Sequence, residues 1–188
     1  MASTGDTVGG TAASTTGGGD THWTNPSNAL VDNTNAATCT GNFAISHWLH
    51  ITNFGFSITA GSTINGITVK VRRKCSSTND WFTQECRLVN SGSILGTTKN
   101  VGLSPTNWTT TATIETFGST SDLWGWTPVI ATINSSTFGV QIYAEDGSTS
   151  SETASVEVIW MNIDYTAPGG GAVSSSKSMM MFFKDNQV

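Results

Sequence analysis

Three histidines are the first candidates for acid–base or metal chemistry, at positions 22, 47 and 50. His47 and His50 are three positions apart, and on a strand this spacing places their side chains on opposite faces of the sheet. A strand therefore could not bring both imidazoles to one metal ion. We expect no metal site and no cofactor at these residues.

Other catalytic motifs are missing from the sequence. It contains no Gly-x-Ser-x-Gly nucleophile turn, no phosphate-binding loop and no His-Glu-x-x-His zinc motif. Carboxylates are sparse, and nothing selects a facing pair of the kind that glycosidases use. Asp32-Asn33 offers oxygen ligands for calcium, but an Asx turn is the favoured interpretation. These observations favour a protein without enzymatic activity.

The cysteines are Cys39, Cys75 and Cys86, and their spacing resembles no zinc site. Cys75 and Cys86 would be able to form a disulfide if they faced each other on adjacent strands. We favour buried thiols, because cysteine packs well as a small apolar residue.

Seven tryptophans are a large number for a chain of 188 residues. Several stand beside turn residues, where an indole ring can stack on a sugar or on a neighbouring protein. Packing into the core is the favoured interpretation for most of them. The candidates for stacking on a ligand are Trp81, Trp108 and Trp126.

Charged residues make up only 11% of the chain and the formal net charge is −5. A nucleic-acid-binding protein needs an excess of Lys and Arg to neutralise phosphates. The one basic cluster spans residues 70–74 and is interpreted as the charged end of a strand. No run of 18 apolar residues exists, and residues 1–20 lack the pattern of a signal peptide. We expect no nucleic-acid or membrane partner.

Alternation of apolar and polar residues predicts an all-β fold. Ile67, Val69 and Val71 alternate with polar residues, as on a half-buried strand. In the segment from Leu49 to Ile58 the phase of this alternation slips by one residue, which predicts a β-bulge. A short helical turn is conceivable at 121–124. The predicted strands are 49–58, 67–72, 82–89, 93–101, 109–117, 138–144 and 155–165, with a short one near 36–40.

This pattern is typical of an antiparallel two-sheet β-sandwich of jelly-roll type, with a closed up-and-down barrel as the lesser alternative. Three zones divide the chain: a Gly/Thr/Ser-rich N-terminal arm at 1–20, the β-sandwich domain at 21–166, and a linker with an apolar C-terminal arm at 167–188.

The last predicted strand is apolar on both faces. Ile159, Met161 and Ile163 form the face that we assign to the core, whereas Val158 and Trp160 lie on the other. We expect an arm or another subunit to cover that second face. The C-terminal arm itself carries a run of large apolar residues, and we expect it to anchor the protein on a neighbour. The expected anchors are Met179, Met180, Met181, Phe182 and Phe183.

Roughly residues 22–166 resemble β-sandwich proteins encoded among the structural genes of tailed bacteriophages and prophages. The resemblance is carried by Trp23–Ala29, Asp32-Asn33 and Ala36-Ala37, and by segments 54–58, 64–67, 121–125, 133–140 and 154–156. It implies a virion component and no catalytic residues. The triple-Met tail and Cys39 fall outside the pattern.

The expected function is therefore that of a non-enzymatic virion structural protein, most simply a capsid decoration (cement) protein or a tail accessory subunit. Its expected partners are copies of itself and major capsid or tail proteins, and its expected location is the virion, after synthesis in the host cytoplasm. The alternative is a carbohydrate-binding module that recognises a surface glycan.

Overall fold

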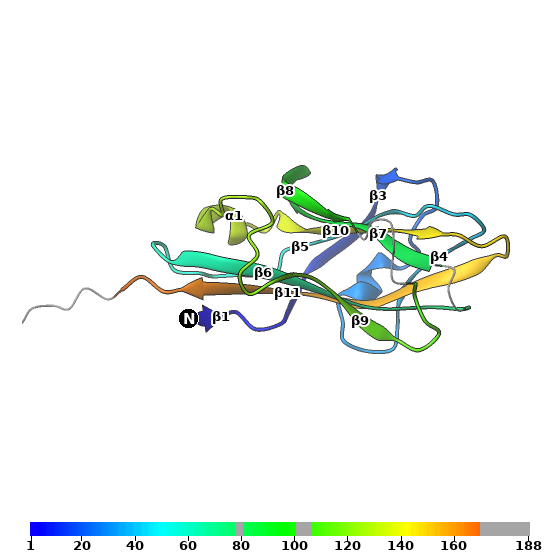
Figure 1. Cartoon of the computed structure of the whole chain (residues 1–188), viewed down its shortest axis with the longest axis horizontal. Coiled ribbons are helices and arrows are strands. Elements are labelled where there is room, and N and C mark those ends of the chain that lie inside the picture. Colours follow the sequence, from blue (N-terminus) through cyan, green and yellow to red (C-terminus); the bar gives the residue numbers. More distant parts are fainter. Residues whose placement is uncertain (78–80, 101–106, 170–188) are drawn as a thin grey trace, which may run out of the picture.

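The computed structural model describes residues 1–77, 81–100 and 107–169. Within these ranges, two antiparallel sheets pack face to face (Figure 1). The first sheet contains β1 (Ala2–Ser3), β2 (Thr7–Val8), β4 (Ala37–Gly41), β6 (Thr63–Cys75), β9 (Thr113–Ser119) and β11 (Glu152–Thr166). The second contains β3 (Thr11–Gly18), β5 (His47–Thr52), β7 (Trp81–Asn90), β8 (Ser93–Asn100) and β10 (Phe138–Asp146).

Eight of these strands make a jelly roll. The order is β4-β11-β6-β9 in the first sheet and β5-β10-β7-β8 in the second. Consecutive strands from β4 to β7 alternate between the sheets, as do the strands from β9 to β11, so the sheets are tied together by crossing connections. The predicted two-sheet sandwich is confirmed, and the barrel alternative is wrong because the sheets remain separate.

The core lies between the two sheets and follows the alternation read from the sequence. Ile67, Val69 and Val71 are fully buried on the inner face of the first sheet. Val140 and Ile142 are fully buried on the second. At roughly 25 cal/mol per Å² of apolar surface, burial of such side chains is the main force that holds the sheets together.

The N-terminal segment is extended, but it is not an arm separate from the sandwich. Strands β1 and β2 pair with β11, and β3 pairs with β5. β1, β2, β4 and Leu30 together pair with one edge of β11 along much of its length. An unpaired strand edge exposes N–H and C=O groups, so the segment satisfies groups that would otherwise need another partner. The predicted boundary at residue 20 is therefore wrong.

The predicted bulge after Leu49 is also wrong. Strand β5 ends at Thr52, and Asn53 has a left-handed φ of 59°. Residues Phe54, Phe56 and Ile58 remain buried in an irregular segment beyond the strand. The helices in the described ranges are a 3-10 turn, η1 (Pro26–Ala29), and a single turn, α1 (Ile130–Ile133). Residues 121–124 are not helical, and only Ser121 and Trp124 among them are turn positions.

Candidate functional site

An apolar groove lies at the end of the sandwich that carries α1. Its volume is about 570 Å³, and one wall comes from the segment that precedes β6 while the other comes from the start of α1. Val129 stands at the rim with 53% of its surface exposed. The apolar lining residues include Ile58, Ala60, Gly61, Pro128, Val129 and Ile130.

Asn134 holds the two walls of this groove together. Its side-chain Nδ2 donates a hydrogen bond to the backbone oxygen of Ile58 at 2.9 Å, and its Oδ1 accepts one from the Ile58 N–H at 2.9 Å. The two bonds join segments that are 76 residues apart in sequence. The groove is therefore built into the fold, because its walls cannot separate without breaking both bonds.

The predicted anchors Met179, Met180, Met181, Phe182 and Phe183 lie outside the described residues. The described chain ends at Gly169, close to the rim of the groove. Strand β11 ends at Thr166, and a Cβ atom at Gly61 would lie 3.5 Å from Cβ of Pro168. The start of β6, α1 and the end of β11 lie at the same end of the molecule in Figure 1.

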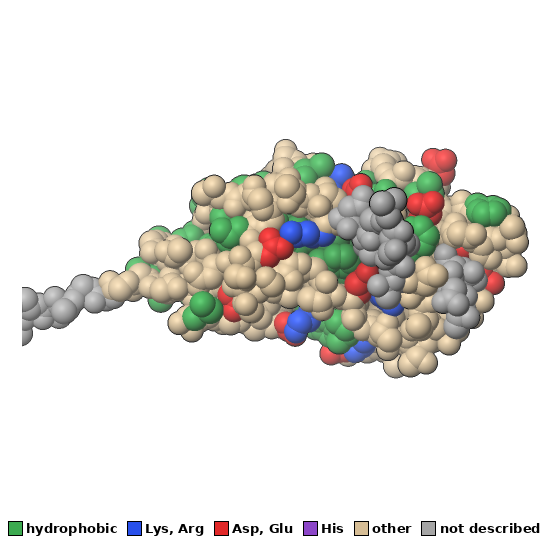
Figure 2. Space-filling view, in the orientation of Figure 1, with side chains coloured by type: hydrophobic (Ala, Val, Ile, Leu, Met, Phe, Trp, Pro, Cys, Tyr) green, Lys and Arg blue, Asp and Glu red, His purple; other side chains and the backbone are tan. Residues whose placement is uncertain are grey.

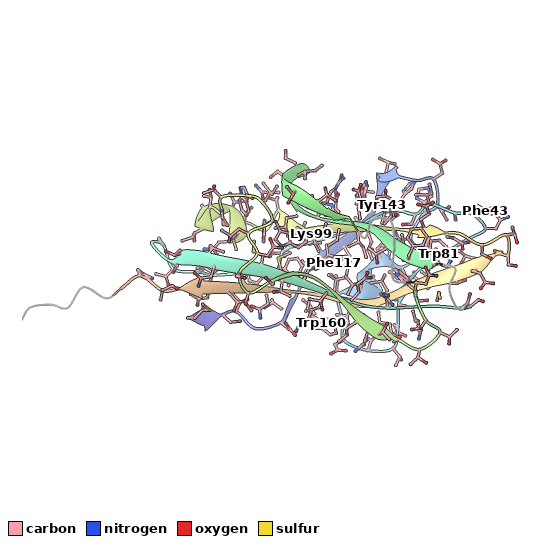
Figure 3. All side chains as sticks on the ribbon, in the orientation of Figure 1. Phe43, Trp81, Lys99, Phe117, Tyr143 and Trp160 are labelled. Carbon is pink, nitrogen blue, oxygen red and sulfur yellow. The ribbon has the colours of Figure 1, made fainter. Side chains whose placement is uncertain are left out.

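The outer face of β11 is covered by the chain itself. Val158 is fully buried although it does not belong to the core cluster, and Leu30, just after η1, forms a β-bridge with it. An arm or another subunit was expected to cover this face, with Val158 as an interface residue. The segment around η1 of the same chain packs there instead of another subunit, so Val158 is not available for an interface. Trp160 is half-buried, pairs with Val8 of β2, and has the Arg72 guanidinium 5.6 Å from its ring centroid. Figure 3 shows it on the first sheet.

The basic residues of β6 are each matched by a carboxylate. Lys70 binds Asp6 at 2.8 Å, and Lys74 binds Glu157 at 2.8 Å. Arg72 bridges Asp32 and Glu157 at 2.6 and 2.8 Å. In Figure 2 the basic side chains on the visible face lie close to acidic ones. The cluster therefore ties the N-terminal segment and the loop after η1 to the first sheet.

The loop at Asp32-Asn33 forms the predicted turn. The Asn33 side chain accepts a hydrogen bond from the Asn35 N–H at 2.8 Å, which is an Asx turn. Asp32 is occupied by Arg72. In the described ranges, no group of three or more His, Cys, Asp or Glu side chains could hold a metal ion.

Arg73, the fourth basic residue of the cluster, forms its ion pair inside the sandwich. Its Nε lies 3.1 Å from Glu115 Oε2, and its side chain is only 3% exposed. Thr83 of the other sheet donates to the same carboxylate oxygen at 2.6 Å. The indole N–H of Trp108 reaches Thr83 Oγ1 at 3.3 Å, and Arg73 lies over the Trp108 ring. These four residues form a polar cluster between the sheets.

Two of the three predicted stacking tryptophans are core residues. Trp81 and Trp108 are fully buried, so the expectation that they offer a ring to a ligand is wrong. The turn-type residues that precede them in the sequence did not exclude burial, because a turn can lead directly into the core. Trp126 keeps part of its surface exposed and stacks on Phe138 with 6.3 Å between the ring centroids.

A cluster that the sequence analysis missed lies on the outer face of the second sheet. The Arg87 guanidinium is 3.6 Å from the Trp48 ring centroid, and the Tyr143 ring meets Trp48 edge-on at 4.7 Å. Arg87 donates two hydrogen bonds to Gln141 Oε1, and Gln141 pairs with His50 in the ladder. Burial and the nearby Arg87 guanidinium lower the pKa of His50. The sequence signal that could have revealed this cluster was the set of alternating outward-facing positions in β5 and β10, which include His50 and Gln141.

Phe43 is an exposed aromatic residue in a strained conformation. It follows β4, has a φ of 46°, and is 63% exposed. A positive φ is unfavourable for a residue with a Cβ atom. Figure 3 shows Phe43 at the end of the sandwich opposite the groove.

All three cysteines lie in the described part of the chain, and each is a buried thiol rather than half of a disulfide, as expected. Burial and the nearby Asp146 raise the pKa of Cys39 to about 12. Burial likewise raises the pKa of Cys86 well above its ordinary value, and Glu115 adds to the shift. Cys39 and Cys86 are therefore protonated thiols packed inside the fold, which suits structural residues better than nucleophiles.

No protein-family model and no curated protein matches the chain. A solved structure described as "CBM4 structure and function" is similar to it with a TM-score of 0.36 and 15% sequence identity, over 81% of this chain and 93% of that chain. A likeness of this degree supports no inference about function. Neither helix in the described ranges has the length and apolar character that crossing a bilayer requires.

Proposed function

We propose that the chain is a non-enzymatic structural subunit of a tailed-bacteriophage virion, acting in capsid decoration or as a tail accessory. It associates with copies of itself and with major capsid or tail proteins, and its C-terminal segment contributes to attachment. The proposal joins the resemblance of residues 22–166 to phage structural proteins with the build of the sandwich.

The observation that carries the proposal is the apolar groove beside the point where β11 ends. Its lining includes Ile58, Val129 and Ile130, and the chain passes its rim at Pro168 before continuing to the apolar run at 179–183. Apolar surface of this kind is costly in water and is suited to a protein contact. A subunit that carries both an apolar groove and an apolar terminal segment is equipped for assembly.

The charged side chains support a scaffold rather than a catalyst. Arg72 and Glu157 fasten loops and strands to one another, and Arg73 with Glu115 joins β6 to β9. Each of these groups is already engaged in the fold. The cluster on the second sheet is likewise held in place by the contact of Arg87 with Gln141.

The test is the composition of purified particles of the phage that carries this gene. Mass spectrometry of particles banded in a density gradient should find the chain at a constant ratio to the major capsid or tail protein. A matched preparation from a phage in which the gene carries an early stop codon should lack it. Absence of the chain from wild-type particles would reject the proposed function.

A second candidate, carbohydrate binding, is favoured by one feature of the outer face of the second sheet. His50 Nε2 and Thr15 Oγ1 are buried there and have no hydrogen-bond partner among the described residues. Half-exposed Tyr143 and the Gln141 amide lie on the same face. A sugar hydroxyl would be able to satisfy a buried acceptor, while Tyr143 offers ring surface for stacking.

A glycan array probed with the full chain tests this second candidate. Binding should be lost in Tyr143→Ala and reduced in His50→Gln, and it should persist in Val129→Asp at the opposite groove. An array without any bound glycan, alongside normal particle composition, would leave assembly as the only supported function.

A further inference from the structure

The lining of the groove between Ile58 and Val129 indicates what kind of ligand would bind there. Its apolar lining is aliphatic, through Ile58, Ala60, Val129 and Ile130. The side-chain N–H and C=O groups of Asn134 are both hydrogen-bonded to the backbone of Ile58, so the Asn134 amide is already engaged within the fold. Ser62 also lines the groove, and its buried Oγ has no hydrogen-bond partner among the described residues. Apart from this hydroxyl, the lining favours flexible or flat apolar side chains, which gain by leaving water without needing hydrogen bonds.

The end of the described chain lies beside this groove. Pro168 is in van der Waals range of the position that a Cβ of Gly61 would take, and Gly61 lines the groove. Residues 170–188 lie outside the described residues. Within them, the sequence 179–183 reads Met-Met-Met-Phe-Phe, and nine residues, 170–178, separate it from Gly169.

Nine residues are enough to connect the two features. A fully extended chain spans at most about 3.3–3.6 Å per residue, so residues 170–178 reach up to roughly 30 Å. The groove starts next to Pro168, well inside that reach. Methionine suits an irregular apolar surface because its side chain is unbranched and adaptable.

We propose that the groove bounded by Ile58, Gly61 and Val129 is the docking site of the chain's own segment Met179–Phe183. In a single subunit the short connection favours docking within one chain, because it keeps the effective concentration of the segment in the millimolar range. Between two subunits the same contact would exchange the segment and join neighbours. This second step rests on the proposed function, whereas docking itself does not.

The test is a disulfide trap in the full-length protein. Val129→Cys combined with Met181→Cys places a thiol at the groove rim and another in the segment. The matched control combines Met181→Cys with Ile114→Cys, since Ile114 on β9 is 56% exposed and does not line the groove. Both Val129 and Ile114 are more than half exposed, so neither substitution disturbs the core.

With oxidised glutathione as the oxidant, the groove pair should form its disulfide at least about ten-fold faster than the control pair, as the raised effective concentration predicts. A cross-linked monomer shows docking within one chain, and a cross-linked dimer shows exchange; either supports the groove as the site. Equal rates for the two pairs would overturn it. If the groove pair cross-links but the protein is absent from purified particles, only the proposed virion function is rejected. If the protein is incorporated into particles but the groove pair does not cross-link faster than the control, only the groove docking is rejected.

Discussion

Arg73 of β6 and Glu115 of β9 form an ion pair inside the sandwich, with 3.1 Å between Nε and Oε2 and side-chain exposures of 3% and 11%. The register places Arg73 on the same face as Val71, which belongs to the core. The pair is tolerated there because Thr113 and Thr83 complete its hydrogen bonds. Removing one partner would leave the other charge buried without compensation.

We therefore expect Arg73→Ala to lower the free energy of unfolding by about 3–5 kcal/mol. The control is Lys70→Ala, which breaks the partly exposed pair with Asp6 and should cost at most about 1 kcal/mol. Urea unfolding followed by tryptophan fluorescence measures both. Similar losses for the two variants would show that the internal pair does not stabilise the sandwich in this way.

Substitution of Phe43, unlike that of Arg73, is expected not to lower stability. Glycine accepts its φ of 46° without a steric penalty, and the exposed ring loses little packing. Phe43→Gly should therefore leave stability unchanged or raise it by up to about 1 kcal/mol. Ile114→Gly, at an exposed position within a strand, should lower stability. A marked loss for Phe43→Gly in thermal unfolding would mean that the ring packs in solution.

The lowered pKa of His50 predicts a dependence of stability on pH. Burial and the Arg87 guanidinium favour the neutral ring in the folded state. Below the ordinary pKa of 6.5 the unfolded chain consequently binds more protons than the folded chain. The contribution is fully present above about pH 6.5 and is lost as the pH falls towards the lowered folded-state value.

Unfolding by urea at several pH values, from about 5 to 7.5, measures this contribution. His50→Gln should flatten the slope that the wild-type protein shows below the pKa of the free side chain. An unchanged slope in His50→Gln would assign the pH dependence to other groups.

The buried thiols predict low reactivity in the native protein. Because burial and Asp146 raise the pKa of Cys39 to about 12, almost none of it is thiolate at neutral pH. We expect no alkylation of Cys39, Cys75 or Cys86 by iodoacetamide in the native protein and complete alkylation of all three in denaturant. Mass spectrometry of the two samples counts the alkylated cysteines. Rapid labelling of the native protein would contradict the burial of the three thiols.

Strand positions were predictable wherever alternation was regular. Ile67, Val69 and Val71 identified β6, and Phe138, Val140 and Ile142 identified β10. The N-terminal strands were not predictable in this way, because Thr, Ala and Gly in β1–β3 give no apolar stripe. These strands are specified by the free edges of β11 and β5, a tertiary feature that local sequence does not contain.

Site residues were harder to predict than strands. Arg73 continues the inward phase of β6, but its charge suggested a surface position until the Glu115 partner, 42 residues away, was known. Val158 lies on the outer phase of β11, yet the segment around Leu30 buries it. Trp81 and Trp108 looked like loop residues because residue types common in turns precede them in the sequence. In each case the deciding contact is long-range in sequence.

The central claim is that the protein is an assembly subunit attached through its C-terminal segment. The most direct measurement is the amount of full-length protein in purified particles when Phe182→Asp and Phe183→Asp are introduced together, with Ile114→Asp as the control. The account predicts that wild type and the control co-sediment with particles while the double variant remains in the soluble fraction. Equal incorporation of all three proteins would contradict it.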